Sequence, residues 1–344
     1  MAHGKPRRWS EGIDLREMRP TRKKVTNMNP VTADNFTRAE TDTYLADALS
    51  HSDGLASFYH YREPMPIDNQ TVVRTNRDTL YSSAVVDLEP GPVTVTLPDP
   101  GTRFMSLIII TEDHYATTVY APGTYSISKE DTGTRYALLG VRTFVDPSDP
   151  DDLPHVHALQ DAATMTQPGG PGTFTVPSWD PASQKTVRDA LLILNTTLPD
   201  MRHAFGRKED VDPVRHLIAT AAAWGGNPDQ DAQYLNITPA KNDGSTEYRL
   251  TVPAEVPVDG FWSITVYGAD GYIPANDLGV YSLNSLTAEP NADGTVSMQF
   301  GGCDNGTSNC IPVPPNWNYM VRLYRPREEI LDGTWIFPEA QPVG

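Results

Sequence analysis

Short runs of β-branched and aromatic residues, separated by proline, glycine and aspartate, fill the first and last thirds of this chain. They lie between residues 70 and 145 and again after residue 230. Residues 93–97 (VTVTL) alternate between apolar and polar, as a half-buried antiparallel strand does. Strands at such close, regular spacing are typical of sandwiches and jelly rolls. The chain is therefore predicted to be mainly β (α+β), with two jelly-roll-like antiparallel β-sandwich halves.

Helices are predicted before and between these two β-rich parts. Residues 32–49 carry apolar side chains at roughly helical spacing. Asp180 before Pro181, and Asp212 before Pro213, are typical helix starts, because Asp caps the helix and proline fits its first position. Residues 146–180 are rich in proline, aspartate and glycine and are interpreted as a loop.

These patterns divide the chain into four parts. They are a flexible N-terminal arm (1–30), a helix with the N-terminal β-sandwich half (31–150), a loop and short helical connector (151–228), and the C-terminal β-sandwich half (229–344).

Charge and hydropathy restrict the partners of the chain. Asp and Glu outnumber Lys and Arg by 44 to 27, giving a formal charge of −17 that repels nucleic acid. No segment has the ~20 apolar residues of a membrane span, and the longest apolar run of the first half, 107–110, is interpreted as a buried strand. The basic start of the chain has no apolar core, so we expect a cytoplasmic protein as written, or an exported one if a signal has been removed.

The only two cysteines, Cys303 and Cys310, lie in a loop-like segment. They either form a disulfide or remain two free thiols near a hairpin tip. With no histidine nearby they make a poor zinc site, and no metal or cofactor is expected.

Several long segments resemble a widespread microbial family, known mainly as two adjacent domains of unknown function numbered 1254 and 1214. In the first half the resemblance is carried by residues 76–89 and 101–115. In the second half it is carried by residues 260–272, 281–287, 291–296 and 316–338. The resemblance covers most of residues 65–340. It implies two jelly-roll-like halves with intervening helices, and little about chemistry.

The densest polar group of the first half is Asn76, Arg77 and Asp78, followed by Tyr81. In an extended segment Asn76 and Asp78 would share one face, and Arg77 would point to the other. An arginine beside an aspartate can hold the carboxylate ionised. The group is interpreted either as part of a site, with Asp78 catalytic and its neighbours binding substrate, or as an ion pair that pins a strand end.

A second polar group, Glu112, Asp113, His114 and Tyr115, directly follows the apolar run. A buried strand that ends in two carboxylates and an imidazole can present reactive groups at a pocket rim. Glu112, Asp113 and His114 are candidate catalytic residues and Tyr115 a candidate binding residue. The alternative is a solvated strand end with a hydrogen-bonded histidine.

Aromatic residues cluster in the last third of the chain, and Trp262 and Trp317 are the two expected at a pocket. Their rings could stack on a sugar. Core packing is the alternative for the whole aromatic set, since about half of any alternating strand faces inward.

The functional hypothesis is a hydrolase, plausibly a glycosidase, acting on a small glycosylated or polyhydroxylated molecule. If Asp78 and Glu112 or Asp113 converge on one cavity, their repulsion would supply an acid and a base at the same pH. Two alternatives remain open: a non-catalytic small-molecule or carbohydrate-binding protein, and an envelope-associated structural protein that forms an extensive homo-oligomer. β-Sandwiches host all three functions.

Overall fold

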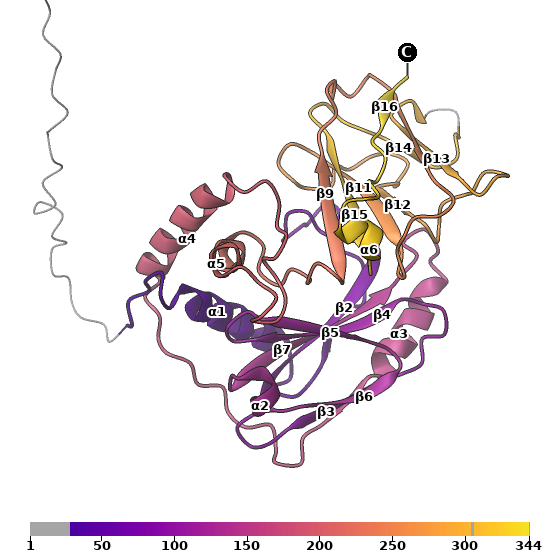
Figure 1. The fold of residues 1–344 in the computed structure, drawn as a ribbon. Coiled ribbons are helices and arrows are strands. Elements are labelled where there is room, and N and C mark those ends of the chain that lie inside the picture. Colours follow the sequence, from indigo (N-terminus) through magenta and orange to yellow (C-terminus); the bar gives the residue numbers. More distant parts are fainter. Residues whose placement is uncertain (1–27, 304–305, 344) are drawn as a thin grey trace, which may run out of the picture.

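The computed structural model describes residues 28–303 and 306–343, and Figure 1 shows two β-rich halves with helices along one flank. Almost all of the predicted N-terminal arm (1–30) lies outside the described residues. Within each half, two sheets of mainly antiparallel strands enclose a hydrophobic core. This confirms the predicted mainly β fold.

The N-terminal half packs a five-stranded sheet, in the order β1-β2-β7-β4-β5, on a three-stranded sheet, in the order β6-β3-β8. The strands of the larger sheet are β1 (Tyr59–His60), β2 (Thr79–Asp87), β7 (Tyr136–Phe144), β4 (Met105–Thr111) and β5 (Ala116–Tyr120). Those of the smaller sheet are β6 (Gly123–Ile127), β3 (Val93–Leu97) and β8 (Thr164–Thr166). Leu107 and Leu139 of the larger sheet meet Val95 of the smaller one in the core between them.

Helix α1 (Phe36–His51) covers part of the other face of the five-stranded sheet. Its Leu45 packs with Ile108 and Ile110 of β4. Because both faces of β4 are covered there, residues 107–110 are apolar throughout, as predicted for a buried strand. Beyond α1, the same face of the sheet turns toward the C-terminal half (Figure 1).

The C-terminal half also contains two sheets, and each of them has four strands. One sheet has the order β14-β13-β10-β16 and the other β12-β11-β15-β9. The strands are β14 (Cys310–Ile311), β13 (Val296–Phe300), β10 (Tyr248–Val252), β16 (Gln341–Pro342), β12 (Ser282–Asn284), β11 (Trp262–Tyr267), β15 (Asn318–Tyr324) and β9 (Ala232–Ile237). A disulfide joins Cys303 to Cys310, so the first of the two alternatives for these cysteines holds.

Two of the predicted helices follow their Asp-Pro starts. Asp180 and Asp212 accept hydrogen bonds from the first backbone N–H groups of α4 and α5. The interpretation of 146–180 as loop is wrong in part, because α3 forms there and packs on β7. The helices not yet given are α2 (Lys129–Thr132), α3 (Asp152–Ala162), α4 (Pro181–Asn195), α5 (Pro213–Ala222) and α6 (Glu328–Leu331).

Candidate functional site

A row of polar and aromatic side chains crosses the five-stranded sheet where α1 no longer covers it. The row follows directly paired residues of neighbouring strands. Tyr81 of β2 pairs with Arg142 of β7, and Arg142 pairs on its other side with Ser106 of β4. Ser106 in turn pairs with Tyr120 of β5. The N–H of Tyr61, just after β1, donates to the carbonyl of Tyr81 and extends the row to the sheet edge. Directly paired residues share one face of a sheet, so these five side chains, the tyrosine–arginine row, form one surface.

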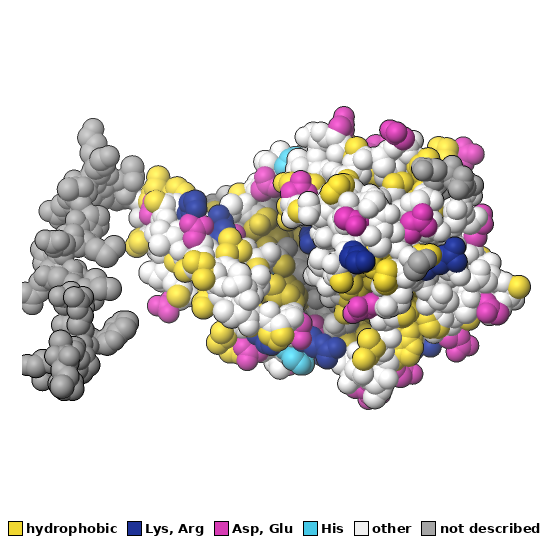
Figure 2. Space-filling view, turned by 90° about the horizontal axis from the view of Figure 1, so that it is seen from above, with side chains coloured by type: hydrophobic (Ala, Val, Ile, Leu, Met, Phe, Trp, Pro, Cys, Tyr) yellow, Lys and Arg dark blue, Asp and Glu magenta, His cyan; other side chains and the backbone are white. Residues whose placement is uncertain are grey.

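Solvent reaches this surface although it lies in the middle of the molecule. Arg142 and Tyr81 are only half-buried, and so is Gly140, two residues along β7 on the same face. Internal strands are normally buried by what packs on them, so partial exposure here marks the floor of a cleft. Figure 2 shows a hollow between the helical flank and the C-terminal half, with hydrophobic side chains along its helical side. We call the partly exposed surface of the tyrosine–arginine row, where the two halves of the chain meet, the junction cleft.

The centre of the row is a hydrogen-bonded group around the Tyr81 hydroxyl. Arg142 Nη1 donates to Tyr81 Oη at 3.1 Å, and Asn76 Nδ2 lies 3.3 Å from the same oxygen. The guanidinium of Arg142 also stands 5.0 Å from the centre of the Tyr81 ring. Among the described residues, Tyr81 is the only hydrogen-bond partner of that guanidinium, so most of its donors are left for a ligand.

The C-terminal half supplies the facing wall. Asn76 Nδ2 also donates to Tyr324 Oη of β15 at 3.1 Å, which ties the two halves together at the row. Tyr324 and the partly exposed Tyr234 of β9 belong to an aromatic cluster at this junction, with Phe144 of β7 on the other side. The cleft is therefore built by both halves of the chain.

A buried charge lies behind this wall. Arg322 of β15 is 2% exposed and donates to Tyr267 Oη at 2.6 Å, to Thr265 Oγ1 at 2.9 Å and to two backbone carbonyls. Asp78 is fully buried nearby and accepts from Asn284 Nδ2 at 3.1 Å through one oxygen, while its Oδ2 has no partner among the described residues. Burial raises the pKa of Asp78, although the Arg322 charge opposes the shift.

The tyrosines of the junction differ in acidity. Burial opposes ionisation of Tyr81, but the Arg142 charge and the Asn76 hydrogen bond outweigh it, and its pKa lies below the ordinary value of 10.0. Burial raises the pKa of Tyr324 well above that value. Burial also raises the pKa of Tyr120, and so does its hydrogen bond to Asp231 Oδ1 at 2.6 Å. Tyr81 is thus set apart from its neighbours as the phenol that loses its proton most readily.

Positive charge gathers at the junction without carboxylate partners. In the part of the chain that the structure describes, five arginines there make no ion pair within 4.0 Å. They are Arg74, Arg77, Arg142, Arg322 and Arg325. Of the five, Arg322 is buried near Asp78, and Arg74 and Arg77 donate to Asn318 Oδ1 and to the Met65 carbonyl, so Arg142 is the guanidinium of the row that is left for an anion.

The first predicted group is only partly at the site. Asn76 and Tyr81 line the junction, whereas Asp78 points away from it toward Asn284. The three residues 76–78 are not extended, because the Asp78 N–H bonds back to Asn76 Oδ1 at 2.7 Å in a turn. Arg77 donates to the Met65 carbonyl and forms no ion pair with Asp78. The predicted pairing of Arg77 with Asp78 is therefore wrong.

The second predicted group lies at the opposite end of the sheet. The Asp78 carbonyl accepts the Val145 N–H beyond one end of β7, and Glu112 Oε2 accepts the Tyr136 N–H at the other end. At about 3.3 Å per residue, the strand between these points spans roughly 30 Å. Asp78 therefore does not share a cavity with Glu112 or with Asp113, which forms an ion pair with Arg38 at the same distant end.

His114 and Tyr115 pack into an aromatic stack. His114 is 1% exposed, its Nε2 accepts the Gly225 N–H at 2.9 Å, and its Nδ1 bonds Thr220 Oγ1 at 2.9 Å. Burial lowers its pKa well below the ordinary value of 6.5. Tyr115 stacks on His216 with ring centres 4.8 Å apart. With both of its ring nitrogens occupied, His114 is the hydrogen-bonded histidine that was the alternative to a catalytic one.

The prediction that Trp262 and Trp317 lie at a pocket is wrong. Trp262 is 4% exposed and Trp317 fully buried, and both belong to the core of the C-terminal half. Trp262 is buried because β11 is covered on both faces. Trp317, just before β15, is buried because its ring packs against Phe300 and Tyr248 of the facing sheet.

Near Glu112, α1 contributes a buried carboxylate that sequence reasoning did not consider. Asp42 is 1% exposed, accepts the Trp179 indole N–H at 2.8 Å, and leaves Oδ1 without a partner in the described residues. Burial raises the pKa of Asp42 to about 6, with the Trp179 hydrogen bond opposing and the Glu112 charge adding to the shift. This carboxyl is held by packing, and solvent barely reaches it.

Asp42 is expected to make stability fall as pH rises from about 4 to about 6. The folded state binds this proton more tightly than the unfolded chain, whose carboxyl has an ordinary pKa of 3.8, so raising the pH costs roughly 2–3 kcal/mol. Asp42→Asn should remove that loss and be more stable than wild type at pH 7.5. Urea unfolding at pH 4.5 and 7.5 measures this, with the exposed Asp47→Asn of the same helix as control. If the free energy of unfolding changes with pH equally in wild type and in Asp42→Asn, the role of Asp42 in this pH dependence is contradicted.

Two other hollows lie on the C-terminal half, with volumes of about 330 and 710 Å³. The first is lined mainly by glycine, alanine and proline around residues 268–274. The second contains Arg327, which already pairs with Asp259. Neither offers an unpaired buried charge, so we place the candidate site at the junction cleft. Within the described ranges, no group of three or more His, Cys, Asp or Glu could hold a metal ion, and no helix has the length and hydropathy to cross a membrane.

Most residues of the junction cleft were missed by sequence reasoning. Arg142, Tyr120, Tyr234 and Asp231 stand in strands or loops with no motif around them. One signal was available at Arg322, since a charge inside the apolar strand 318–324 needs partners when buried.

Comparison with known proteins identifies the parts that build the cleft. Residues 55–167 match the family described as a protein of unknown function, DUF1254, and residues 232–328 match the one described as a protein of unknown function, DUF1214. The chain belongs to this paired-domain family. Tyr81 and Arg142 lie in its DUF1254 part, and Tyr234 and Tyr324 in its DUF1214 part.

One solved structure supports the fold of the paired-domain family, and a second was found at lower structural similarity. The crystal structure of the VPA0106 protein from Vibrio parahaemolyticus is 18% identical, with a TM-score of 0.71, over 91% of this chain and 98% of that one. An uncharacterised protein from Burkholderia cenocepacia is 16% identical, with a TM-score of 0.48, over 90% and 88% of the two chains. No curated protein matches the chain.

Proposed function

We propose that this protein is an acid–base enzyme that binds a small carboxylic acid in the junction cleft and removes a proton from it with Tyr81. One observation carries the proposal: Arg142 meets Tyr81 Oη at 3.1 Å and has no carboxylate partner among the described residues. This pairs an anion-binding group with a phenol of lowered pKa, at a surface that solvent reaches.

Arg142 is the anion-binding group of this proposal, because the two N–H groups of Asn76 Nδ2 are already taken by Thr79, Tyr324 and Tyr81. A guanidinium presents donors in a planar fork that fits a carboxylate, and half-burial strengthens the attraction relative to bulk water. Burial opposes the charge of Arg142, and the Tyr81 oxygen that accepts its hydrogen bond favours it. The wider group of unpaired arginines attracts an anion to a protein that is otherwise acidic.

Tyr81 is the proton acceptor. Its hydroxyl oxygen accepts bonds from Arg142 and Asn76, which favour the ionised form. With the substrate carboxylate on Arg142 and Tyr81 ionised, the C–H proton next to the carboxylate passes to the phenolate oxygen and gives the neutral phenol, and the electron pair of the C–H bond moves onto the carboxylate beside the guanidinium. Return of a proton gives isomerisation, and departure of a group from the neighbouring carbon gives elimination.

The other phenols fit the opposite role. The pKa values of Tyr324 and Tyr120 are raised, so both keep their protons. The Tyr120 proton is already donated to Asp231, which leaves Tyr324 to donate a hydrogen bond to a leaving group or to the developing charge. Groups whose environments push their pKa values apart at one site are typical of paired acid and base functions.

The hydrolase predicted from the sequence required a carboxylate pair. The separation of Asp78 from Glu112 leaves that mechanism without its acid and base. Hydrolysis remains open in another form, in which Tyr81 deprotonates a water molecule, and product analysis distinguishes the two reaction classes.

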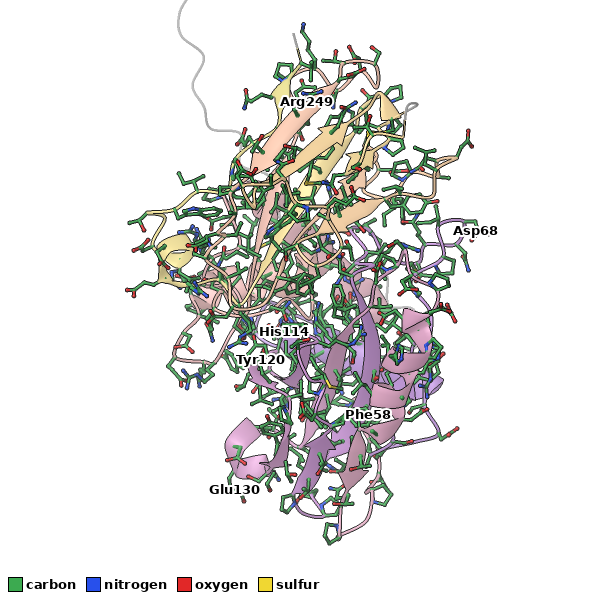
Figure 3. All side chains as sticks on the ribbon, turned by 90° about the vertical axis from the view of Figure 1, so that its right-hand side faces the viewer. Phe58, Asp68, His114, Tyr120, Glu130 and Arg249 are labelled. Carbon is green, nitrogen blue, oxygen red and sulfur yellow. A yellow bond between two sulfur atoms is a disulfide. The ribbon has the colours of Figure 1, made fainter. Side chains whose placement is uncertain are left out.

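The test is incubation in D₂O with a library of small hydroxy, uronic and aromatic acids, read by mass spectrometry. We expect deuterium at the carbon next to the carboxylate, or an unsaturated product, with wild type. Arg142→Gln should weaken substrate binding about tenfold or more by loss of a charged hydrogen-bond partner. The control is Arg249→Gln, on the distal edge of the C-terminal half (Figure 3).

Three other outcomes are informative. Addition of water across a cleaved bond would assign the chain to the hydrolases. Binding that Arg142→Gln weakens, without turnover of any acid, would favour the non-catalytic binding protein. Binding or turnover that Arg142→Gln and Arg249→Gln leave equally intact would refute the site itself.

A further inference from the structure

A second row of residues crosses the sheet beside the tyrosine–arginine row. In this row Tyr59 of β1 pairs with Ser83 of β2, and Ser83 pairs on its other side with Gly140 of β7. Gly140 in turn pairs with Ile108 of β4. This row is two residues farther along each strand, so its side chains point to the same face as those of Arg142 and Tyr81. Its two middle positions carry only a hydroxymethyl group and a hydrogen atom.

The small residues leave a hollow between larger neighbours. Ser83 and Gly140 are partly exposed, whereas the next residues along this face, Val85 and Leu138, are buried under α1. The backbone of β7 is therefore partly exposed at Gly140, two residues from Arg142 on the same face. A methyl group at Gly140 would stand 3.0 Å from Ile108 Cγ2, so the Ile108 side chain bounds this position on one side and a larger residue would project into the cleft.

Two tyrosines form the rim of this hollow at the sheet edge. Tyr59 and Tyr61 meet edge to face, with ring centres 4.9 Å apart and planes at 89°. Tyr61 is 42% exposed, and no hydrogen bond is recorded for either hydroxyl among the described residues. An edge-to-face pair holds both rings in place and presents an aromatic surface to a ligand.

We infer that the substrate is a carboxylic acid borne on a six-membered ring, such as a uronic acid. Its carboxylate would bind Arg142, and its ring would lie on the floor over Gly140 and Ser83, with Tyr59 and Tyr61 at the rim. A flat floor without side chains beside a fixed cation suits a ring better than a flexible chain, because a ring loses little conformational freedom on binding. This inference rests on the proposed function.

The experiment compares three probes of similar size by titration calorimetry. D-Glucuronate has the ring and the acid, D-gluconate has the acid without the ring, and methyl glucoside has the ring without the acid. We expect glucuronate to bind wild type at least about tenfold more tightly than gluconate, and methyl glucoside not to bind. Gly140→Ala should weaken glucuronate binding at least about fivefold and change gluconate binding less than about twofold.

Ser83→Val is the second variant, because it fills the same hollow from the neighbouring strand and breaks no recorded hydrogen bond of the Ser83 hydroxyl. Ser126→Val, exposed on β6 outside the cleft, is the control, and thermal unfolding verifies that each variant is folded. Equal affinities of wild type for glucuronate and gluconate, unchanged in both cleft variants, would overturn the ring subsite and leave the proposed function intact. Absence of binding by both acids, with turnover of no acid in the library, would overturn the proposed function as well.

Discussion

Tyr81→Phe is expected to lower kcat by about 10²–10⁴ while changing the affinity for the acid less than about threefold. Phenylalanine keeps the ring that Arg142 stacks on but removes the only hydroxyl positioned by both Arg142 and Asn76. The substrate carboxylate would still bind the Arg142 guanidinium, but the C–H proton of the substrate would have no acceptor. Steady-state kinetics together with direct binding measurements separate the two effects.

The control for this variant is Tyr272→Phe, which removes a hydroxyl from an exposed tyrosine on the C-terminal half. In wild type, kcat should rise with pH as Tyr81 ionises, with an apparent pKa below the ordinary phenol value of 10.0. Equal loss of binding and turnover in Tyr81→Phe would contradict the base assignment and make Tyr81 a binding residue.

Arg322→Met should destabilise the fold by about 3–5 kcal/mol. The guanidinium is 2% exposed and satisfies Tyr267 Oη, Thr265 Oγ1 and two carbonyls, all of which would lose a partner. It is also the main positive charge near the buried Asp78. Urea unfolding at neutral pH measures the loss of stability.

Two further variants test the cause of that loss. Arg327→Met breaks an exposed ion pair with Asp259 and should cost less than about 1 kcal/mol. Asp78→Asn combined with Arg322→Met should recover part of the stability, because the uncompensated carboxylate is then gone. If the double variant is no more stable than Arg322→Met, the charge of Asp78 contributes nothing and the lost hydrogen bonds explain the whole effect.

The strands and two helices could be predicted because their signals are local. Alternation in β3, the apolar run in β4, and the Asp-Pro starts of α4 and α5 each lie within a few adjacent residues. Helix α3 escaped prediction because its acidic first turn and Pro154 resemble a loop. Only packing reveals it, through the buried Val156 and Gln160.

The site could be predicted only where neighbours in sequence are neighbours in space, as with Asn76 and Tyr81. The pair of Tyr81 and Arg142 depends on the register of two strands that are far apart in the chain. The wrong pairing of Asp78 with Glu112 has the same origin. β2 and β4 both run antiparallel to β7, so the start of one and the end of the other point to opposite ends of the sheet.

The cleft floor comes from one half of the chain and its facing wall from the other, joined at Asn76 and Tyr324. A gene that encoded either half alone would encode half a cleft, even if its product folded. Selection for the proposed activity would therefore act on the two segments as one heritable unit. Recombination that separates them is expected to leave inert descendants, and recombination that keeps them together can exchange the loops around the cleft and so alter what it accepts.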